Sequence, residues 1–159
     1  MRYVWAGPPG TFRVEIAHVE RREGGLSARG TQIAVEDAPY ELRYEVDEER
    51  LFVEVVGATT LELGLDGADF FDLESSPLFN SFPVVRHGLH RGGEPRDFVM
   101  AWISVPDLTI SRSEQRYDPL RGEGLVGFST GAFKAEIEFD DEGFVVDYPD
   151  LAERVYPSG

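Results

Sequence analysis

Residues 40–55 read YELRYEVDEERLFVEV, and this stretch decides the class of fold. Tyr40, Leu42, Tyr44 and Val46 alternate with charged residues, which is the pattern of a β-strand with one buried face. The next four residues, DEER, are typical of a turn, and the apolar alternation resumes at Leu51. The stretch therefore predicts a β-hairpin.

The same period of two recurs along the chain. It predicts further strands at residues 12–16, 61–65, 133–139 and 144–148. In the first of these, Phe12, Val14 and Ile16 form the apolar face, and Arg13 and Glu15 the polar one. We therefore expect the three apolar side chains to face the core.

Residues 98–105, FVMAWISV, differ because both faces of the strand are apolar. Such a strand is covered on both sides. One compartment would receive Phe98, Met100 and Trp102, and the other Val99, Ala101 and Ile103. Two interpretations remain open: a central strand in a plain core, which this stretch alone favours, or a curved sheet that encloses an apolar space.

Helical patterns are scarce, since glycine and proline are scattered through the chain. We expect only a short helical turn in the tail, from Pro149 to about Val155. A chain of 159 residues is long enough for one domain with a substantial core. The expected fold is therefore mostly β, with little helix, in a single domain over residues 1–159.

The chain has 30 acidic and 15 basic residues, a net charge of -15. This charge repels nucleic-acid phosphates and anionic lipid surfaces, so we expect no nucleic-acid partner. Lys134 is the single lysine. An acid excess with little lysine favours a protein adapted to concentrated salt, where charge is screened over short distances. The alternative is an ordinary acidic protein from a GC-rich genome.

The cellular location is predicted from absent features of the sequence. The chain has no cysteine, so no disulfide or thiolate metal site forms. The N-terminus lacks the pattern of a signal peptide. Residues 98–106, an uncharged and mostly apolar stretch, are far shorter than the roughly 18 apolar residues of a membrane span. We expect a cytoplasmic protein without integral membrane association.

The sequence offers little support for catalysis, metal binding or a cofactor. Residues 127–131, GFSTG, match the nucleophile elbow G-x-S-x-G, but a strand pattern follows and no histidine lies beyond His90. His87 and His90 lie among glycines, where a metal-binding helix is not expected. No phosphate-binding glycine loop is present. We therefore assign no catalytic residue, metal ligand or cofactor.

Residues 72–86, DLESSPLFNSFPVVR, carry the most specific motif. They resemble the core D-[IL]-x-x-T-P-x-x-N-x-x-P-[IV]-x-R of the putative glycolipid-binding family of bacteria and archaea. Ser76 stands where the family has threonine, and Val85 where it commonly has a second arginine. Further matches are Trp5, Glu15, Tyr44, residues 115–117 and residues 140–149. The resemblance implies a spiral β-roll or half-barrel, a curved antiparallel sheet around an apolar cavity, similar in shape to lipoprotein carriers.

The resemblance implies a binding or carrier protein for an amphiphilic ligand, either a glycolipid or an isoprenoid or acyl chain. The candidate ligand-binding residues are Asp72, Asn80, Arg86, Gln115, Tyr117, Tyr44, Phe98, Met100 and Trp102. Asn80 suits sugar hydroxyls, and Arg86 suits a phosphate or carboxylate. We favour a structural alternative, in which Asp72 and Arg86 form an ion pair and Asn80 holds a turn between two prolines.

Residues 75–122 carry six arginines and five acidic residues, whereas the rest of the chain is strongly acidic. These arginines either meet a ligand or pair with acidic residues of other strands.

Two further interpretations belong to other classes of protein. One is an enzyme that acts on a small or lipid-like substrate, with Asp72 or Asp147 as base and Arg86 or His87 in support. No pair of carboxylates stands out among thirty, so this interpretation is the less favoured. The other is a ligand-free module that forms a homodimer.

Overall fold

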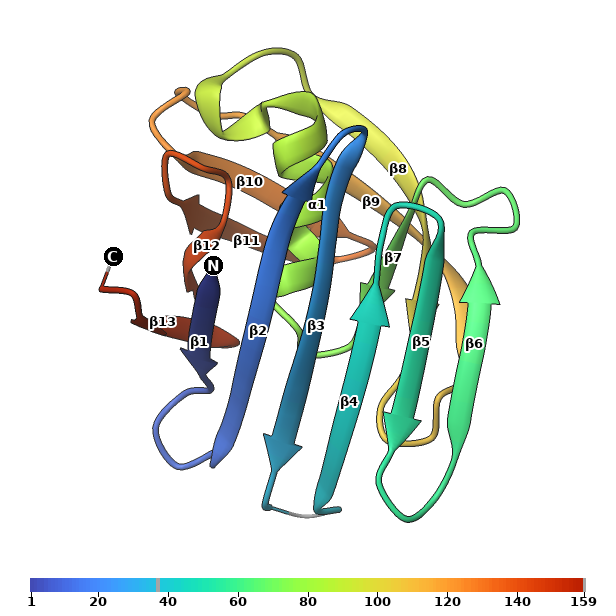
Figure 1. The fold of residues 1–159 in the computed structure, drawn as a ribbon. Coiled ribbons are helices and arrows are strands. Elements are labelled where there is room, and N and C mark those ends of the chain that lie inside the picture. Colours follow the sequence, from blue (N-terminus) through green and yellow to red (C-terminus); the bar gives the residue numbers. More distant parts are fainter. Residues whose placement is uncertain (37, 159) are drawn as a thin grey trace.

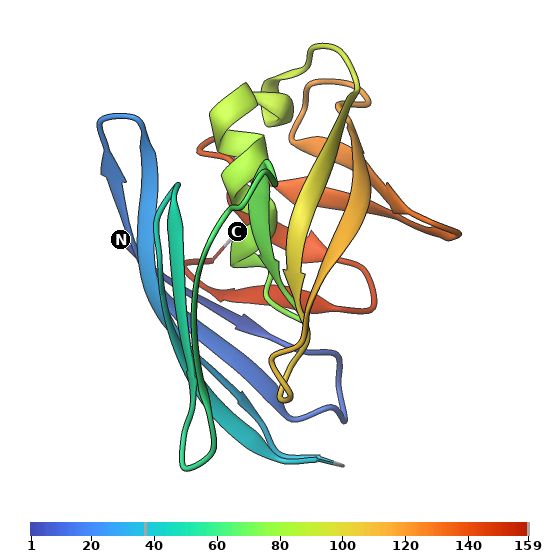
Figure 2. The ribbon, with the colours of Figure 1, turned by 90° about the vertical axis from the view of Figure 1, so that its right-hand side faces the viewer.

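The computed structural model describes residues 1–36 and 38–158, which form one curved sheet with an α-helix on its concave side (Figure 1, Figure 2). The strands are β1 (Arg2–Ala6), β2 (Arg13–Arg22), β3 (Gly25–Ala34), β4 (Tyr40–Val46), β5 (Arg50–Val55), β6 (Thr60–Gly64), β7 (Phe70–Leu73), β8 (Arg96–Ile103), β9 (Ile110–Asp118), β10 (Leu125–Thr130), β11 (Phe133–Phe139), β12 (Val145–Tyr148) and β13 (Ala152–Tyr156). The helices are α1 (Leu78–His87) and a 3-10 turn, η1 (Leu89–Arg91). The predicted mostly β, single-domain fold is confirmed.

The 13 strands follow the order β6-β5-β4-β3-β2-β1-β13-β12-β11-β10-β9-β8-β7. Every neighbouring pair is antiparallel except β7 and β8, which are parallel. β1 and β13 join the two halves of the sheet, and β6 and β7 are its edges. The sheet is thus curved but not closed, which agrees with the half-barrel form of the prediction.

The predicted hairpin of β4 and β5 is confirmed, with Val46 paired to Leu51. Its turn is stabilised by Asp47, whose Oδ1 accepts hydrogen bonds from the backbone N–H groups of Glu49 and Arg50 at 2.8 and 2.9 Å. This is the local role that makes aspartate common in turns.

β8 is covered on both sides, as its sequence predicts. Phe98 and Met100 are buried on one face, and Ala101 and Ile103 on the other. Val99 departs from the pattern, because 38% of it is exposed. The parallel pairing places Phe70 of β7 beside Met100. β7 and β8 therefore form an edge of the sheet that turns into the protein interior.

The predicted core face of residues 12–16 is wrong. Ile16 is 37% exposed and Phe12 68% exposed, whereas Glu15 is only 2% exposed. Ala17 and Val19 lie on the same face of β2 as Glu15 and are buried in the core, so this face of the strand packs inward. Glu15 is tolerated there because other polar side chains surround it.

The tail and the central motif also differ from the prediction. The expected helical turn after Pro149 is wrong, because the tail forms β13, which pairs with β1 through Val4 and Tyr156. The expected ordered loop after Pro77 is wrong as well, because α1 begins at Leu78 and includes Pro83. A proline inside a helix costs about 3 kcal/mol, and burial of one apolar face of α1 offsets this.

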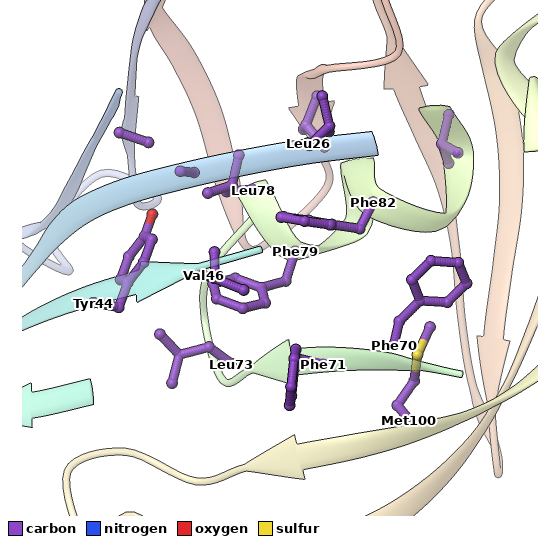
Figure 3. Close-up of a cluster of buried hydrophobic side chains, with 14 of the residues drawn as sticks. Leu26, Tyr44, Val46, Phe70, Phe71, Leu73, Leu78, Phe79, Phe82 and Met100 are labelled. Atoms are coloured by element: carbon purple, nitrogen blue, oxygen red, sulfur yellow. The ribbon is translucent and has the colours of Figure 1, made fainter. Parts of the chain in front are cut away.

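The concave side of the sheet, expected as an apolar cavity, is occupied by α1 (Figure 1, Figure 2). Phe79 of α1 lies between β4 and β7, with its ring 5.3 Å from that of Tyr44 (Figure 3). The buried apolar residues of the helix are Leu78, Phe79, Phe82 and Val84. Among the described residues, no helix is long and apolar enough to cross a membrane.

Candidate binding site

The candidate site is a group of four polar side chains that we call the Asp72 cluster: Asp72 on β7, Asn80 on α1, and Gln115 and Tyr117 on β9. Gln115 Nε2 donates a hydrogen bond to Asp72 Oδ2 at 2.7 Å, and Asn80 Nδ2 donates one to the Tyr117 hydroxyl at 3.0 Å. Gln115 and Tyr117 are two residues apart on one strand, so they share a face. The structure thus brings together four of the nine predicted site residues.

Aromatic rings surround the Asp72 cluster. The ring of Phe98 lies 5.7 Å from that of Tyr117, which lies 5.3 Å from Phe128. Phe128 is in turn 6.2 Å from Tyr148. Edge-to-face pairs of this kind stabilise the packing beyond their buried area. The polar groups are therefore held against a rigid aromatic wall built from four strands.

One edge of the Asp72 cluster is open to solvent, since Asp72, Ser113 and Thr130 are only partly buried. Gln115 Nε2 also lies 3.3 Å from Ser113 Oγ, and the Ser113 and Thr130 hydroxyls are 3.4 Å apart. Gln115 Oε1 is buried and accepts no hydrogen bond within the described part of the chain. The edge therefore presents hydroxyl groups, and the unpartnered amide oxygen lies buried behind them.

The environment of Asp72 favours its neutral form. Burial raises the pKa of this carboxyl to about 6, with a smaller contribution from Glu74, while the hydrogen bond from Gln115 opposes the rise. Burial and the nearby Asp72 also raise the pKa of the Tyr117 hydroxyl well above its ordinary value. Asp72 is thus an acceptor at neutral pH and gains a proton under mildly acidic conditions.

A second group of buried polar side chains, the Glu15 cluster, consists of Glu15 on β2, Gln32 on β3, Tyr40 and Tyr44 on β4, and Ser76 before α1. Gln32 Nε2 lies 3.5 Å from Glu15 Oε1, and the Tyr40 hydroxyl donates to Gln32 Oε1 at 2.5 Å. Glu15 Oε2, the Tyr44 hydroxyl and Ser76 Oγ are buried without a well-aligned partner among the described residues.

Burial raises the pKa of Glu15 from 4.5 to about 7. The nearby hydroxyls of Ser76 and Tyr44 favour the charged form, as do the Gln32 amide and a backbone N–H at the start of α1. They do not compensate for the loss of water. Sequence reasoning did not pick out this cluster. The signal available was that Glu15 shares its face with Ala17 and Val19.

The other predicted residues lie in different surroundings. Met100 is buried beside Phe98, and Trp102 is partly exposed and paired with Asp72 across β7 and β8. Tyr44 belongs to the Glu15 cluster. Arg86 lies apart, with its guanidinium 3.6 Å from the Glu48 carboxylate.

The favoured structural alternative for the motif is wrong. Asp72 bonds to Gln115 instead of forming an ion pair with Arg86, which pairs with Glu48. Asn80 does not hold a turn, because it lies in the first turn of α1 and faces Tyr117. The physical reason is the helix itself, which carries Arg86 two turns away from the Asp72 cluster.

The residues proposed for an enzyme are not gathered at one place. Asp147 is exposed on β12, and Arg86 pairs with Glu48. His87 stacks on Phe98 with ring centroids 5.3 Å apart, and burial together with Arg96 lowers its pKa. Ser129, the serine of the elbow pattern, lies within β10 and is followed by β11.

No three histidine, aspartate or glutamate side chains converge as metal ligands in residues 1–36 and 38–158. Three arginines of residues 75–122 pair with acidic residues of other elements: Arg86 with Glu48, Arg112 with Asp66, and Arg116 with Asp97.

Comparison with known proteins places these features in a family. The crystal structure of a DUF1089 family protein from Pseudomonas aeruginosa has the same fold, with a TM-score of 0.73 and 23% sequence identity over 94% of this chain and 95% of that one. No curated protein matches the chain. A family model described as "Putative glycolipid-binding" matches residues 54–154. The match includes the whole Asp72 cluster and confirms the resemblance of the motif, so this chain belongs to the putative glycolipid-binding family.

Proposed function

We propose that this protein binds the sugar headgroup of an amphiphile at the Asp72 cluster. The observation that carries the proposal is that Asp72, a partly buried residue, accepts a hydrogen bond from the Gln115 amide beside the Asn80–Tyr117 pair and an aromatic wall. Ligand sites commonly combine an apolar lining with a few placed polar groups. The family description agrees with such a ligand.

The hydrogen-bonding groups of the cluster match the chemistry of a sugar. Each sugar hydroxyl both donates and accepts, and Asp72 offers a strong acceptor for one such donor. The hydroxyls of Ser113 and Thr130 lie at the open edge, where each can donate or accept a hydrogen bond. A ligand with several hydroxyl groups can donate to Asp72 and also accept from the serine and threonine hydroxyls. A fully ionised phosphate can only accept hydrogen bonds, so it would leave Asp72 without a donor.

The apolar part of the ligand needs a different surface, because α1 occupies the concave side. Two aromatic side chains near the open edge supply it. Trp102 lies beside Asp72, and Phe133, which is 48% exposed, has its ring 6.2 Å from Phe128. In this proposal the chain of the amphiphile leaves the cluster along these rings, while the sugar lies at the open edge beside Asp72, Ser113 and Thr130.

The test uses n-octyl glucoside as the probe, below its micelle concentration, with binding measured by calorimetry and by NMR. Asp72→Asn removes the charge and should weaken binding by about tenfold or more, since a hydrogen bond to a charged group is worth about 1.5–3 kcal/mol. Asp97→Asn is the matched control, because Asp97 is exposed on the neighbouring strand and pairs with Arg116.

Equal binding of octyl glucoside by both variants would contradict the proposal. Equal binding of octyl glucoside and 1-octanol by the unmodified protein would also contradict it, because a site that reads sugar hydroxyls must reject a chain that lacks them. Mass spectrometry of material extracted from the purified protein adds an independent measurement, with a glycosylated amphiphile as the expected compound.

A further inference from the structure

The Asp72 carboxylate has no positively charged partner in the part of the chain that the structure describes. Its pKa is set by burial, by the hydrogen bond from Gln115 and by the charge of Glu74, and none of these is a cation. Neither Asp72 nor Glu74 forms an ion pair with a described residue. A charge removed from water is costly unless an opposite charge compensates it. The Asp72 cluster therefore carries an uncompensated negative charge.

The two arginines of β9 do not supply the missing charge. Arg112 and Arg116 lie on the same strand as Gln115, but side chains of a strand point alternately to its two faces. The Arg112 guanidinium lies 3.9 Å from the Asp66 carboxylate, and that of Arg116 lies 3.0 Å from Asp97. Both cations are therefore directed to the other face of the sheet, away from the Asp72 cluster.

The Asp72 carboxylate has hydrogen-bonding capacity left for a ligand. A carboxylate accepts about four hydrogen bonds. Among the described residues, the donor that reaches Asp72 is the neutral amide of Gln115, which bonds to Oδ2 at 2.7 Å. Asp72 is only partly buried, so a ligand can supply further donors. An ammonium group offers three donors and no acceptor, whereas a hydroxyl group offers one donor.

An aromatic side chain stands next to this carboxylate. Trp102 pairs with Asp72 across β7 and β8, so the two side chains share a face of the sheet, and the indole is partly exposed. A cation is attracted to the face of an aromatic ring, most strongly to that of tryptophan. A carboxylate beside an indole ring therefore suits an ammonium group better than a neutral hydroxyl.

We propose that the Asp72 cluster prefers a headgroup that carries a positively charged amine, such as an amino sugar, over a neutral sugar. The inference rests on the proposed function and specifies its ligand. The overall charge of -15 supports it, because an acidic protein raises the local concentration of cations.

The test compares n-octyl glucoside with n-octyl glucosaminide, in which an amine replaces one hydroxyl of the sugar. The ratio of the two affinities, measured by calorimetry below the micelle concentrations, is the amine preference. At about pH 7 it should be about tenfold in favour of the amine, because a hydrogen bond between charged groups is roughly twice as strong as a neutral one. At about pH 5 it should fall below about twofold, because Asp72, with a pKa of about 6, has gained a proton.

The other groups that face Asp72 do not account for such a pH dependence, with the exception of one carboxylate. Burial raises the pKa of the Tyr117 hydroxyl on β9 and of the Tyr148 hydroxyl on β12, so both stay neutral. From α1 the cluster receives the neutral amide of Asn80, and β8 contributes an indole. Glu74 is the remaining carboxylate that acts on Asp72.

Variants separate the two carboxylates. Asp72→Asn should reduce the amine preference to about one at both pH values, since it removes the charge that the amine meets. Glu74→Gln keeps an acceptor for the Val105 N–H and should lower the preference about twofold, because its charge acts from further away. Asp97→Asn is the matched control and should leave the preference unchanged. Glu74→Gln and the change of pH keep the inference testable if Asp72→Asn does not fold.

The outcomes distinguish this inference from the proposed function. Equal affinity for the two probes at neutral pH would overturn the inference and leave the proposed function intact. An amine preference that persists in acid and in Asp72→Asn would also overturn it, because the attracting charge would then lie elsewhere. Binding of n-octylamine as tight as that of the glucosaminide would contradict the proposed function alone, since the sugar would contribute nothing. Failure of both sugar probes to bind would contradict both.

Discussion

Replacement of Glu15 by glutamine should stabilise the protein at alkaline pH and leave its stability nearly unchanged at acidic pH. Glutamine has the shape of the protonated side chain, so it keeps an acceptor for Gln32 and gains a donor for the buried hydroxyls of Tyr44 or Ser76. It also removes the need to bury a negative charge. The variant therefore separates the packing of the Glu15 cluster from its ionisation.

The magnitude follows from the pKa of Glu15, which burial raises from 4.5 to about 7. The folded protein holds the proton over a range of pH in which the unfolded chain has lost it. Stability from this group is fully present below about pH 4.5 and is lost as the pH rises through about 7. Each pKa unit is worth about 1.4 kcal/mol, so the loss is roughly 3 kcal/mol. Glu15→Gln should recover most of it.

The free energy of unfolding is measured by urea titration at about pH 5 and about pH 8.5, followed by tryptophan fluorescence. Trp5 is a suitable reporter because it is buried and its indole N–H donates to the Val145 carbonyl at 2.9 Å. Glu20→Gln, on the exposed side of the same strand, is the control and should show no such pH dependence. The reasoning fails if Glu15→Gln is destabilising at pH 8.5 by as much as at pH 5, since Glu15 would then be stable as an anion.

Two other predictions concern the sheet and the surface. Gly30→Ala should destabilise the protein by about 1–3 kcal/mol in the same urea assay, because a Cβ on Gly30 would overlap the Tyr44 ring; unchanged stability would mean that this ring moves freely. The acidic surface predicts a melting temperature that rises between about 0.1 M and about 3 M KCl, since salt screens the repulsion of 30 acidic residues, and an equal melting temperature would refute adaptation to salt.

Alternation of apolar and polar residues was enough to predict most of the sheet, because the side chains of a strand point alternately to its two faces. It was not enough at β2, where either face could be buried. Val14 and Ile16 are larger and more apolar than Glu15 and Ala17, yet the second pair faces the core. The choice depends on which face meets α1 and the neighbouring strands, and the local signal for it was Ala17 and Val19 further along the same strand.

The helix was missed because its prolines looked like loop signals. Pro77 immediately precedes α1 and has helical backbone angles, which suits a residue without an N–H to donate. Phe79 and Phe82 are three residues apart, a helical spacing that was visible in the sequence. Contacts between this segment and the sheet, and not the local sequence, favour the helix over a loop. The motif was enough to single out Asp72 and Asn80 as candidate site residues. Their hydrogen-bond partners on β9 could be identified only from the structure.

The change from strand to helix within residues 72–86 explains how the polar residues of this motif reach two different clusters. Asp72 lies in β7, Ser76 lies between β7 and α1, and Asn80 is in the first turn of α1. Asp72 and Asn80 meet β9 through Gln115 and Tyr117, while Ser76, just before the helix, lies near Glu15. One short segment thus supplies polar groups to both clusters. These contacts hold α1 on the concave side of the sheet, and this is why the proposed function assigns the Asp72 cluster to a headgroup and not to an acyl chain.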